Sequence, residues 1–133
     1  MKTIHRNLIL LENLSIMQKD KKTSIITIEV NSKDENGFTA LYHAAIDAKP
    51  EVIELLLSFG ANPNIGNKIG NTPLHAILQL PQGIVPDLPE RQDAIITLLL
   101  KKGADATVAN NQGKTPAMLA RGTKYEAWLA NPR

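Results

Sequence analysis

The chain has 133 residues, of which 43% are hydrophobic and 21% charged, so it fits one folded domain and not a disordered segment. A formal net charge of +2 argues against a nucleic-acid partner, which usually selects a concentrated basic surface. The chain has no cysteine, which excludes disulfides, thiolate metal sites and a cysteine nucleophile.

The first 33 residues are the least regular part of the chain. The apolar run Leu8–Leu11 is too short for a signal peptide, and no segment approaches the roughly 20 apolar residues of a membrane span. This run can form one helix, whereas Ile26, Ile28 and Val30 alternate with polar residues as a strand does. The sequence therefore does not decide whether this segment is built from a helix, from a strand or from both.

From residue 37 onward the sequence repeats itself. Gly37-Phe38-Thr39-Ala40-Leu41 returns after 33 residues as Gly70-Asn71-Thr72-Pro73-Leu74, and after a further 43 as Gly113-Lys114-Thr115-Pro116. A second block, residues 52–62, returns after 43 residues as 95–105. Both blocks therefore agree on one insertion of ten residues.

Each repeated block predicts a pair of helices. Thr39, Thr72 and Thr115 each precede a helical stretch, where a hydroxyl can cap free backbone N–H groups. Gly60 and Gly103 follow leucine triplets where a helix can end in a left-handed residue. Residues 52–57 are apolar on more than one side, so we expect that helix to be buried between neighbours in a stack.

The blocks Thr72-Pro73-Leu74-His75 and Gly103-Ala104-Asp105 resemble the ankyrin repeat. The resemblance implies an all-α fold, an ankyrin-repeat solenoid of helix-turn-helix units joined by β-hairpin loops. We expect residues 1–133 to form a single domain. It would consist of a degenerate N-terminal cap (1–33), a repeat (34–66), a repeat with the ten-residue insertion near 80–89 (67–109) and a C-terminal capping repeat (110–133).

The resemblance also implies that the hairpin tips and first helices form a concave face that binds a protein. The family's variable contact positions correspond here to Glu35, Asn36, Phe38, Ile46, Asp47, Lys68, Ile69, Asn71, Gln79, Leu80, Asn111, Gln112 and Lys114. Phe38 is either an anchor in a partner's pocket or a residue that packs on the next hairpin. Ile69 poses the same choice.

The insertion predicts a loop, because three prolines and a glycine within residues 80–89 oppose a helix. Its apolar side chains, Ile84, Val85 and Leu88, either fold back onto the solenoid or form a second binding surface. Folding back is the favoured alternative.

The sequence predicts no catalytic residues, no metal site and no cofactor, because no nucleophile motif, phosphate loop or ligand spacing is present. Among the histidines, the resemblance gives His75 a structural role between repeats, and His43 is predicted on the surface without a ligand neighbour. The predicted activity is binding of a partner protein by a cytoplasmic monomer, without nucleic acid or membrane. The alternative is an effector that a host-associated bacterium secretes into a host cell to bind a host protein.

Overall fold

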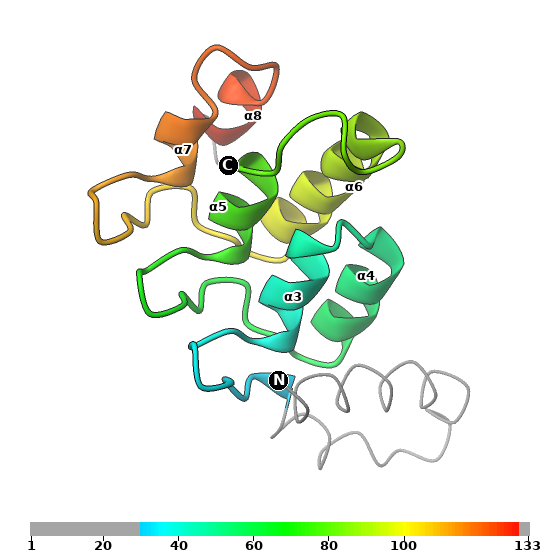
Figure 1. Ribbon diagram of the computed structural model, residues 1–133, viewed down its shortest axis with the longest axis vertical. Coiled ribbons are helices and arrows are strands. Elements are labelled where there is room, and N and C mark those ends of the chain that lie inside the picture. Colours follow the sequence, from blue (N-terminus) through cyan, green and yellow to red (C-terminus); the bar gives the residue numbers. More distant parts are fainter. Residues whose placement is uncertain (1–29, 131–133) are drawn as a thin grey trace.

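A computed structural model describes residues 30–130, and in this part of the chain pairs of helices stack in sequence order (Figure 1). The pairs are α3 (Ala40–Ile46) with α4 (Pro50–Ser58), α5 (Pro73–Leu78) with α6 (Leu88–Lys101), and α7 (Pro116–Leu119) with α8 (Glu126–Ala130). A loop projects sideways ahead of each first helix (Figure 1). The predicted all-α stack is confirmed, and within residues 30–130 the loops are tight turns without extended strands. The predicted N-terminal cap lies outside the described residues except for its last four.

The helices begin where the threonines predict. The Thr39 hydroxyl accepts a hydrogen bond from Tyr42 N at 3.2 Å, and the Thr115 hydroxyl accepts one from Met118 N at 3.1 Å. Each bond satisfies a backbone donor that the first turn of a helix leaves free. Gly60 and Gly103, with φ of +94° and +96°, follow α4 and α6 as predicted.

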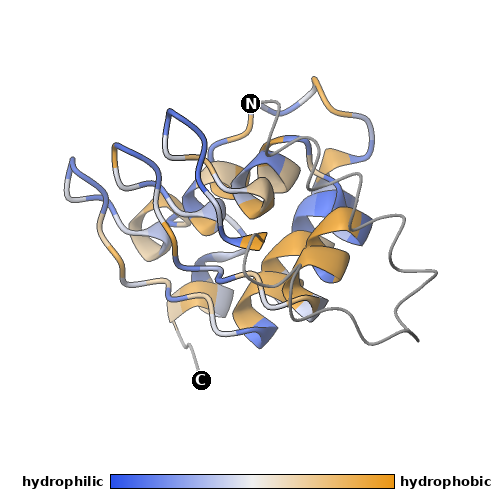
Figure 2. Ribbon diagram, turned by 90° about the horizontal axis from the view of Figure 1, so that it is seen from below, coloured by the Kyte–Doolittle hydropathy of each residue, from blue (hydrophilic) through white to orange (hydrophobic). Residues whose placement is uncertain are grey.

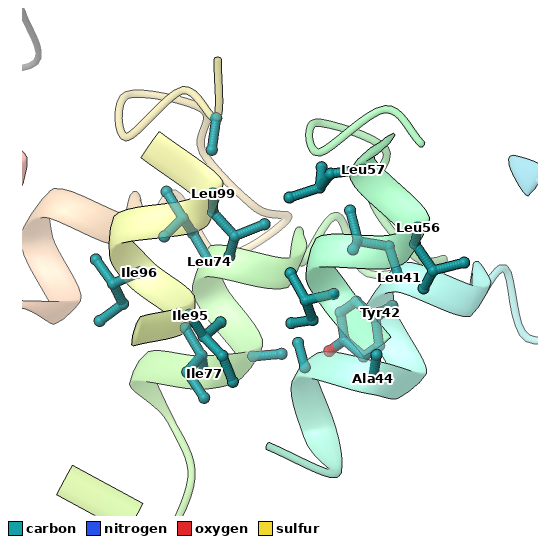
Figure 3. Packing of buried hydrophobic residues seen from close by; sticks show 14 of the residues in the cluster. Leu41, Tyr42, Ala44, Leu56, Leu57, Leu74, Ile77, Ile95, Ile96 and Leu99 are labelled. Atoms are coloured by element: carbon teal, nitrogen blue, oxygen red, sulfur yellow. The ribbon is translucent and has the colours of Figure 1, made fainter. Parts of the chain in front are cut away.

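The core is built from aliphatic side chains between successive helix pairs. Helix α3 packs on α5 and α4 packs on α6, which brings together Leu41, Leu56, Leu74, Ile77 and Ile95 (Figure 3). The tips of the loops are mainly hydrophilic and the helices carry most of the hydrophobic residues (Figure 2). Because one helix pair alone cannot cover this surface, each repeat depends on its neighbour.

Two asparagines show that the stack keeps one register from residue 31 onward. Asn31 Oδ1 accepts from Asn62 N at 2.8 Å, and its Nδ2 donates to Gly60 O at 3.4 Å. Asn64 repeats this arrangement, since Asp105 N donates to its Oδ1 at 2.7 Å and its Nδ2 donates to Gly103 O at 3.0 Å. Each asparagine therefore links one repeat to the loop that ends the second helix of the next.

The insertion is a loop only up to residue 87. The expectation that its prolines exclude helix from residues 80–89 is wrong for the last two of these residues. Helix α6 begins at Leu88, with Pro89 in its first turn, where a missing N–H costs no intrahelical bond. The insertion thus lengthens α6 toward the first repeat. There Arg91 Nη1 donates to Ala48 O at 2.9 Å, at the turn between α3 and α4.

Candidate functional site

Each projecting loop is closed by one side chain at its start. Asp34 Oδ1 accepts hydrogen bonds from the backbone N–H groups of Asn36 and Phe38, both at 2.9 Å. Asn67 does the same for Ile69 and Asn71, and Asn110 for Gln112 and Lys114, at distances between 2.9 and 3.0 Å. Short polar side chains of this kind stabilise tight turns by replacing backbone partners. The three loops therefore share one fixed shape, and we call them tips 1, 2 and 3 (residues 34–38, 67–71 and 110–114).

Tips 2 and 3 are bonded directly to each other. Asn111 N donates to Ile69 O at 2.9 Å, and Asn111 Nδ2 donates to Lys68 O at 3.2 Å. Beneath them, Asn110 Nδ2 donates to Asn71 Oδ1 at 2.8 Å, and both of these side chains are buried. These contacts hold tips 2 and 3 together as one platform and not as two independent loops.

His75 links the second repeat to the third, as the sequence predicts. Its Nε2 donates to Lys114 O at 2.9 Å, while its Nδ1 accepts from Thr72 N at 3.0 Å and lies 2.9 Å from the Thr72 hydroxyl. Burial lowers the pKa of His75, although the bond to Lys114 O opposes the shift. The ring is therefore neutral in the folded protein near pH 7. Tyr42 occupies the same position in the first repeat, and burial raises the pKa of its hydroxyl, although the nearby Asn71 side chain opposes the shift.

His43 is partly exposed, and it has one carboxylate neighbour that the sequence did not indicate. Its Nε2 lies 3.0 Å from Asp34 Oδ2, at the base of tip 1. Burial alone would raise the pKa of Asp34, but the hydrogen bonds from His43 and from the Phe38 and Asn36 N–H groups lower it overall. The pair helps to close tip 1. Within residues 30–130, no third ionisable side chain joins it to form a metal site.

Phe38 is a packing residue of its own repeat. Its ring stacks on Tyr42 with centroids 4.8 Å apart, and His43 meets it edge-on at 5.2 Å. The ring is half-buried, so only one side remains for a partner. The stacking of Phe38 on Tyr42 is a contact that the sequence analysis did not predict.

Most of the other predicted contact residues lie on the surface. Ile69 is the most exposed apolar residue among them, with 56% of its surface accessible, and Ile46 is also exposed. Leu80 is half-buried, and Asn71 is buried between tips, which removes it from a contact surface. The remaining exposed residues are polar: Glu35, Asn36, Asp47, Lys68, Gln79, Asn111, Gln112 and Lys114.

The three apolar residues of the insertion differ in their burial. Leu88 is buried in the core and Val85 is half-buried against it, so these two fold back. Ile84, next to Gly83 at the outer bend, is 72% exposed. The bend is held from below, because Gln82 Nε2 donates to Gln92 Oε1 at 3.2 Å and Gln92 Nε2 donates to Ile77 O at 2.8 Å.

The described surface combines exposed apolar and polar side chains. Within residues 30–130, no group of three or more His, Asp or Glu side chains is placed to hold a metal ion. Across the same range, no helix has the length and apolar character needed to cross a membrane. What the arrangement offers is a row of rigid tips with apolar and polar side chains displayed on it.

The residues that close and join the tips were not predicted from the sequence. Asp34, Asn67 and Asn110 recur with the same 33- and 43-residue spacing as the Thr-Pro blocks, and that spacing could have identified them. Asn31 and Asn64 are also 33 residues apart, but that spacing does not reveal the bonds that their side chains make. The Asp34–His43 pair occurs in one repeat only, because the second and third repeats have asparagine in place of Asp34, so no repeated spacing could have identified it.

Comparison with known proteins also gives ankyrin repeats. The family model described as "Ankyrin repeats (3 copies)" matches residues 7–85, which includes most of the segment predicted as an N-terminal cap. Among solved structures, the ankyrin repeat domain of Bcl-3, titled a unique member of the IkappaB protein family, matches with a TM-score of 0.64 and 25% identity, over 77% of this chain and 41% of that one. An ankyrin repeat domain from Acinetobacter baumannii matches with a TM-score of 0.64 and 34% identity, over 76% of this chain and 50% of that one.

Curated relatives match over shorter stretches. A putative ankyrin repeat protein of Rickettsia felis is 42% identical over 55 residues, covering 38% of this chain and 24% of the relative. The Notch-regulated ankyrin repeat-containing protein B of Danio rerio is 41% identical over 46 residues, covering 35% of this chain and 41% of the relative. The chain thus spans less than half the length of these relatives.

Proposed function

Because the chain belongs to the ankyrin-repeat family, we propose that it binds a partner protein through its concave face, the tips together with the exposed sides of α3 and α5. Ankyrin repeats are in general protein–protein interaction modules without catalytic chemistry of their own. The observation that carries the proposal is a pair of exposed isoleucines: Ile69 lies on tip 2, which is bonded to tip 3, and Ile46 lies at the end of α3.

The rigidity of the platform favours binding. Tips 2 and 3 are joined by backbone and side-chain bonds, and every tip is closed by its own Asp or Asn. A surface that is ordered before it meets its partner loses little conformational entropy on binding. Exposed apolar side chains in a polar surround match the anatomy of protein interfaces, in which an apolar centre is ringed by polar residues.

The charges on the face specify the chemistry of the partner. Among the predicted contact positions, Glu35 and Asp47 carry negative charge in the first repeat, and Lys68 and Lys114 carry positive charge in the second and third. The proposed partner segment presents apolar side chains to Ile46 and Ile69, with a basic group opposite the first repeat and an acidic group opposite the others. Such complementarity sets orientation and association rate more than affinity.

A second candidate surface is the bend of the insertion. Ile84 is displayed there by a loop that Gln82, Gln92 and the buried Leu88 hold in place. One exposed isoleucine is a small contact, so this bend is the weaker candidate and an alternative to the concave face. The alternative of a secreted effector gains no support, since the similar proteins come from bacteria, yeast, insect, fish, mammal and a virus.

The proposal is tested by capture from a lysate of the source cells with three forms of the protein. The variant Ile46→Asp with Ile69→Asp changes only exposed side chains of the concave face, and Ile84→Asp is the matched control on the insertion. We expect a protein that is captured by the wild type and by the control and is lost with the concave-face variant. Calorimetry with the captured protein then measures the change, which we expect to exceed about tenfold in Kd. Capture that persists in the concave-face variant and disappears with Ile84→Asp would transfer the function to the insertion.

A further inference from the structure

Tip 1 carries a pair of residues with a chemistry of its own. Asn36 is followed by Gly37, and this is the only Asn-Gly pair in the chain. In such a pair the backbone nitrogen of the glycine can attack the side-chain amide carbon of the asparagine, because glycine has no Cβ to crowd the approach. Asn36 is exposed, so water has access to its amide.

The fold requires the glycine of this pair. Gly37 has a left-handed φ of +81°, and a Cβ atom added to it would lie 3.0 Å from Lys68 N of tip 2. Any other residue there would be strained and crowded. Tips 2 and 3 have a glycine at the equivalent position, but it is preceded by Ile69 and by Gln112. Only tip 1 therefore combines the required glycine with an asparagine.

The corresponding peptide group of tip 2 is bonded at both ends. Gly70 N donates to Asn67 O at 2.9 Å, and Ile69 O accepts from Asn111 N of tip 3 at 2.9 Å. Two hydrogen bonds thus hold the peptide group between Ile69 and Gly70, and one of them comes from a neighbouring tip.

The peptide group between Asn36 and Gly37 is bonded at one end. Gly37 N donates to Asp34 O at 2.9 Å, whereas within residues 30–130 no hydrogen bond reaches Asn36 O. Opening of a single bond inside tip 1 therefore frees Gly37 N. Backbone bonds in exposed loops open at a small fraction of the free energy of global unfolding.

We propose that Asn36 is a site of spontaneous deamidation in the folded protein. Gly37 N attacks Asn36 Cγ and forms a C–N bond, and the side-chain nitrogen leaves as ammonia with the proton that Gly37 N loses. Water then opens the cyclic succinimide at one of its two carbonyl carbons, which gives aspartate or isoaspartate. Either product adds a negative charge next to Glu35 near pH 7.

Isoaspartate also changes the shape of tip 1. Asp34 Oδ1 accepts hydrogen bonds from the N–H groups of Asn36 and Phe38, both at 2.9 Å. The isoaspartyl linkage lengthens the main chain between these two donors by one carbon, so a single oxygen no longer serves both. Deamidation thus opens tip 1. Its effect on partner binding rests on the proposed function, whereas the reaction itself does not.

The test follows the reaction in the full, folded chain at mildly alkaline pH in water labelled with heavy oxygen. Tandem mass spectrometry locates the modified residues, and the label separates reaction during incubation from reaction during digestion. We expect labelled product at Asn36 to form at least about tenfold faster than at Asn111, which is exposed on tip 3 and precedes Gln112.

The matched control is Ile69→Asn, which places the same Asn-Gly pair in the tip whose peptide group is bonded at both ends. Ile69 is exposed, and circular dichroism checks that the variant is folded. In this variant we expect the pair in tip 2 to react about fivefold more slowly than the pair in tip 1 of the same molecule, the effect of one additional hydrogen bond.

The same incubation in urea gives the rate at Asn36 without the fold. An Asn36 that reacts in urea and stays intact in the folded chain overturns the proposal, and so does a folded-state rate no higher than that of Asn111. Equal rates at the two pairs of Ile69→Asn would overturn the role given to the missing bond at Asn36 O. The comparison of Asn36 with Asn111 needs no variant, so it stands even if Ile69→Asn does not fold.

Discussion

Alanine at Gly70 and at Gly113 separates backbone strain from packing between tips. Both glycines have left-handed φ, +83° and +76°, so alanine costs each about 1 kcal/mol in strain. Only Gly70 faces a neighbour, because a Cβ there would lie 3.0 Å from Asn110 Cα and 3.2 Å from Asn111 N. Relieving that overlap shifts the tip 3 backbone and the Asn111 N to Ile69 O bond, which adds about 1–3 kcal/mol. We expect Gly70→Ala to cost about 2–4 kcal/mol and Gly113→Ala about 1 kcal/mol.

Urea denaturation of both variants, followed by far-UV circular dichroism at pH 7, gives the two free energies of unfolding. The difference between the variants is the informative quantity, since strain and the change in unfolded-state entropy are shared. Equal losses for the two would refute the stacking of the tips on each other.

Other predictions concern the links between repeats and the insertion. His75→Ala should cost about 3 kcal/mol, because it removes the bond to Lys114 O and leaves the buried Thr72 N–H unpaired; a loss below 1 kcal/mol would contradict this. The lowered folded-state pKa of His75 means that the unfolded chain binds the extra proton, so wild-type stability should fall as pH drops below 6.5, and this fall should be smaller in His75→Ala across an acid titration. Asn64→Ala should cost about 1–2 kcal/mol through its bonds to Gly103 and Asp105, against less than about 0.5 for the exposed Gln79→Ala in the same urea assay. Leu88→Ala should cost about 2–4 kcal/mol and Ile84→Ala less than about 0.5, and thermal melts giving equal values would contradict their different burial.

Repetition made most of the fold predictable. Two blocks in one register place Thr39, Thr72 and Thr115 at helix starts and Gly60 and Gly103 after helix ends, and those positions follow from local chemistry that each block contains. The helix pairs then stack because residues such as Ile53 and Ile96 are apolar on faces that only a neighbour can cover.

The parts that escaped prediction depend on contacts between distant residues. Leu88 is one of several apolar residues in a proline-rich stretch, and only the three-dimensional path of α6 shows that it is buried while Ile84 is exposed. Phe38 and Tyr42 stack because tip 1 folds back over its own helix, which the spacing of the two residues alone does not reveal.

Site-specific cross-linking tests the central claim, binding through the concave face, most directly. A photoreactive residue is placed at Ile69 on the concave face, and in a second protein at Thr97, which is exposed on α6. Both proteins are irradiated in lysate of the source cells, and adducts are identified by mass spectrometry. Our account predicts a specific protein adduct from position 69 that position 97 does not form. The same adducts from both positions, or adducts from position 97 alone, would contradict it.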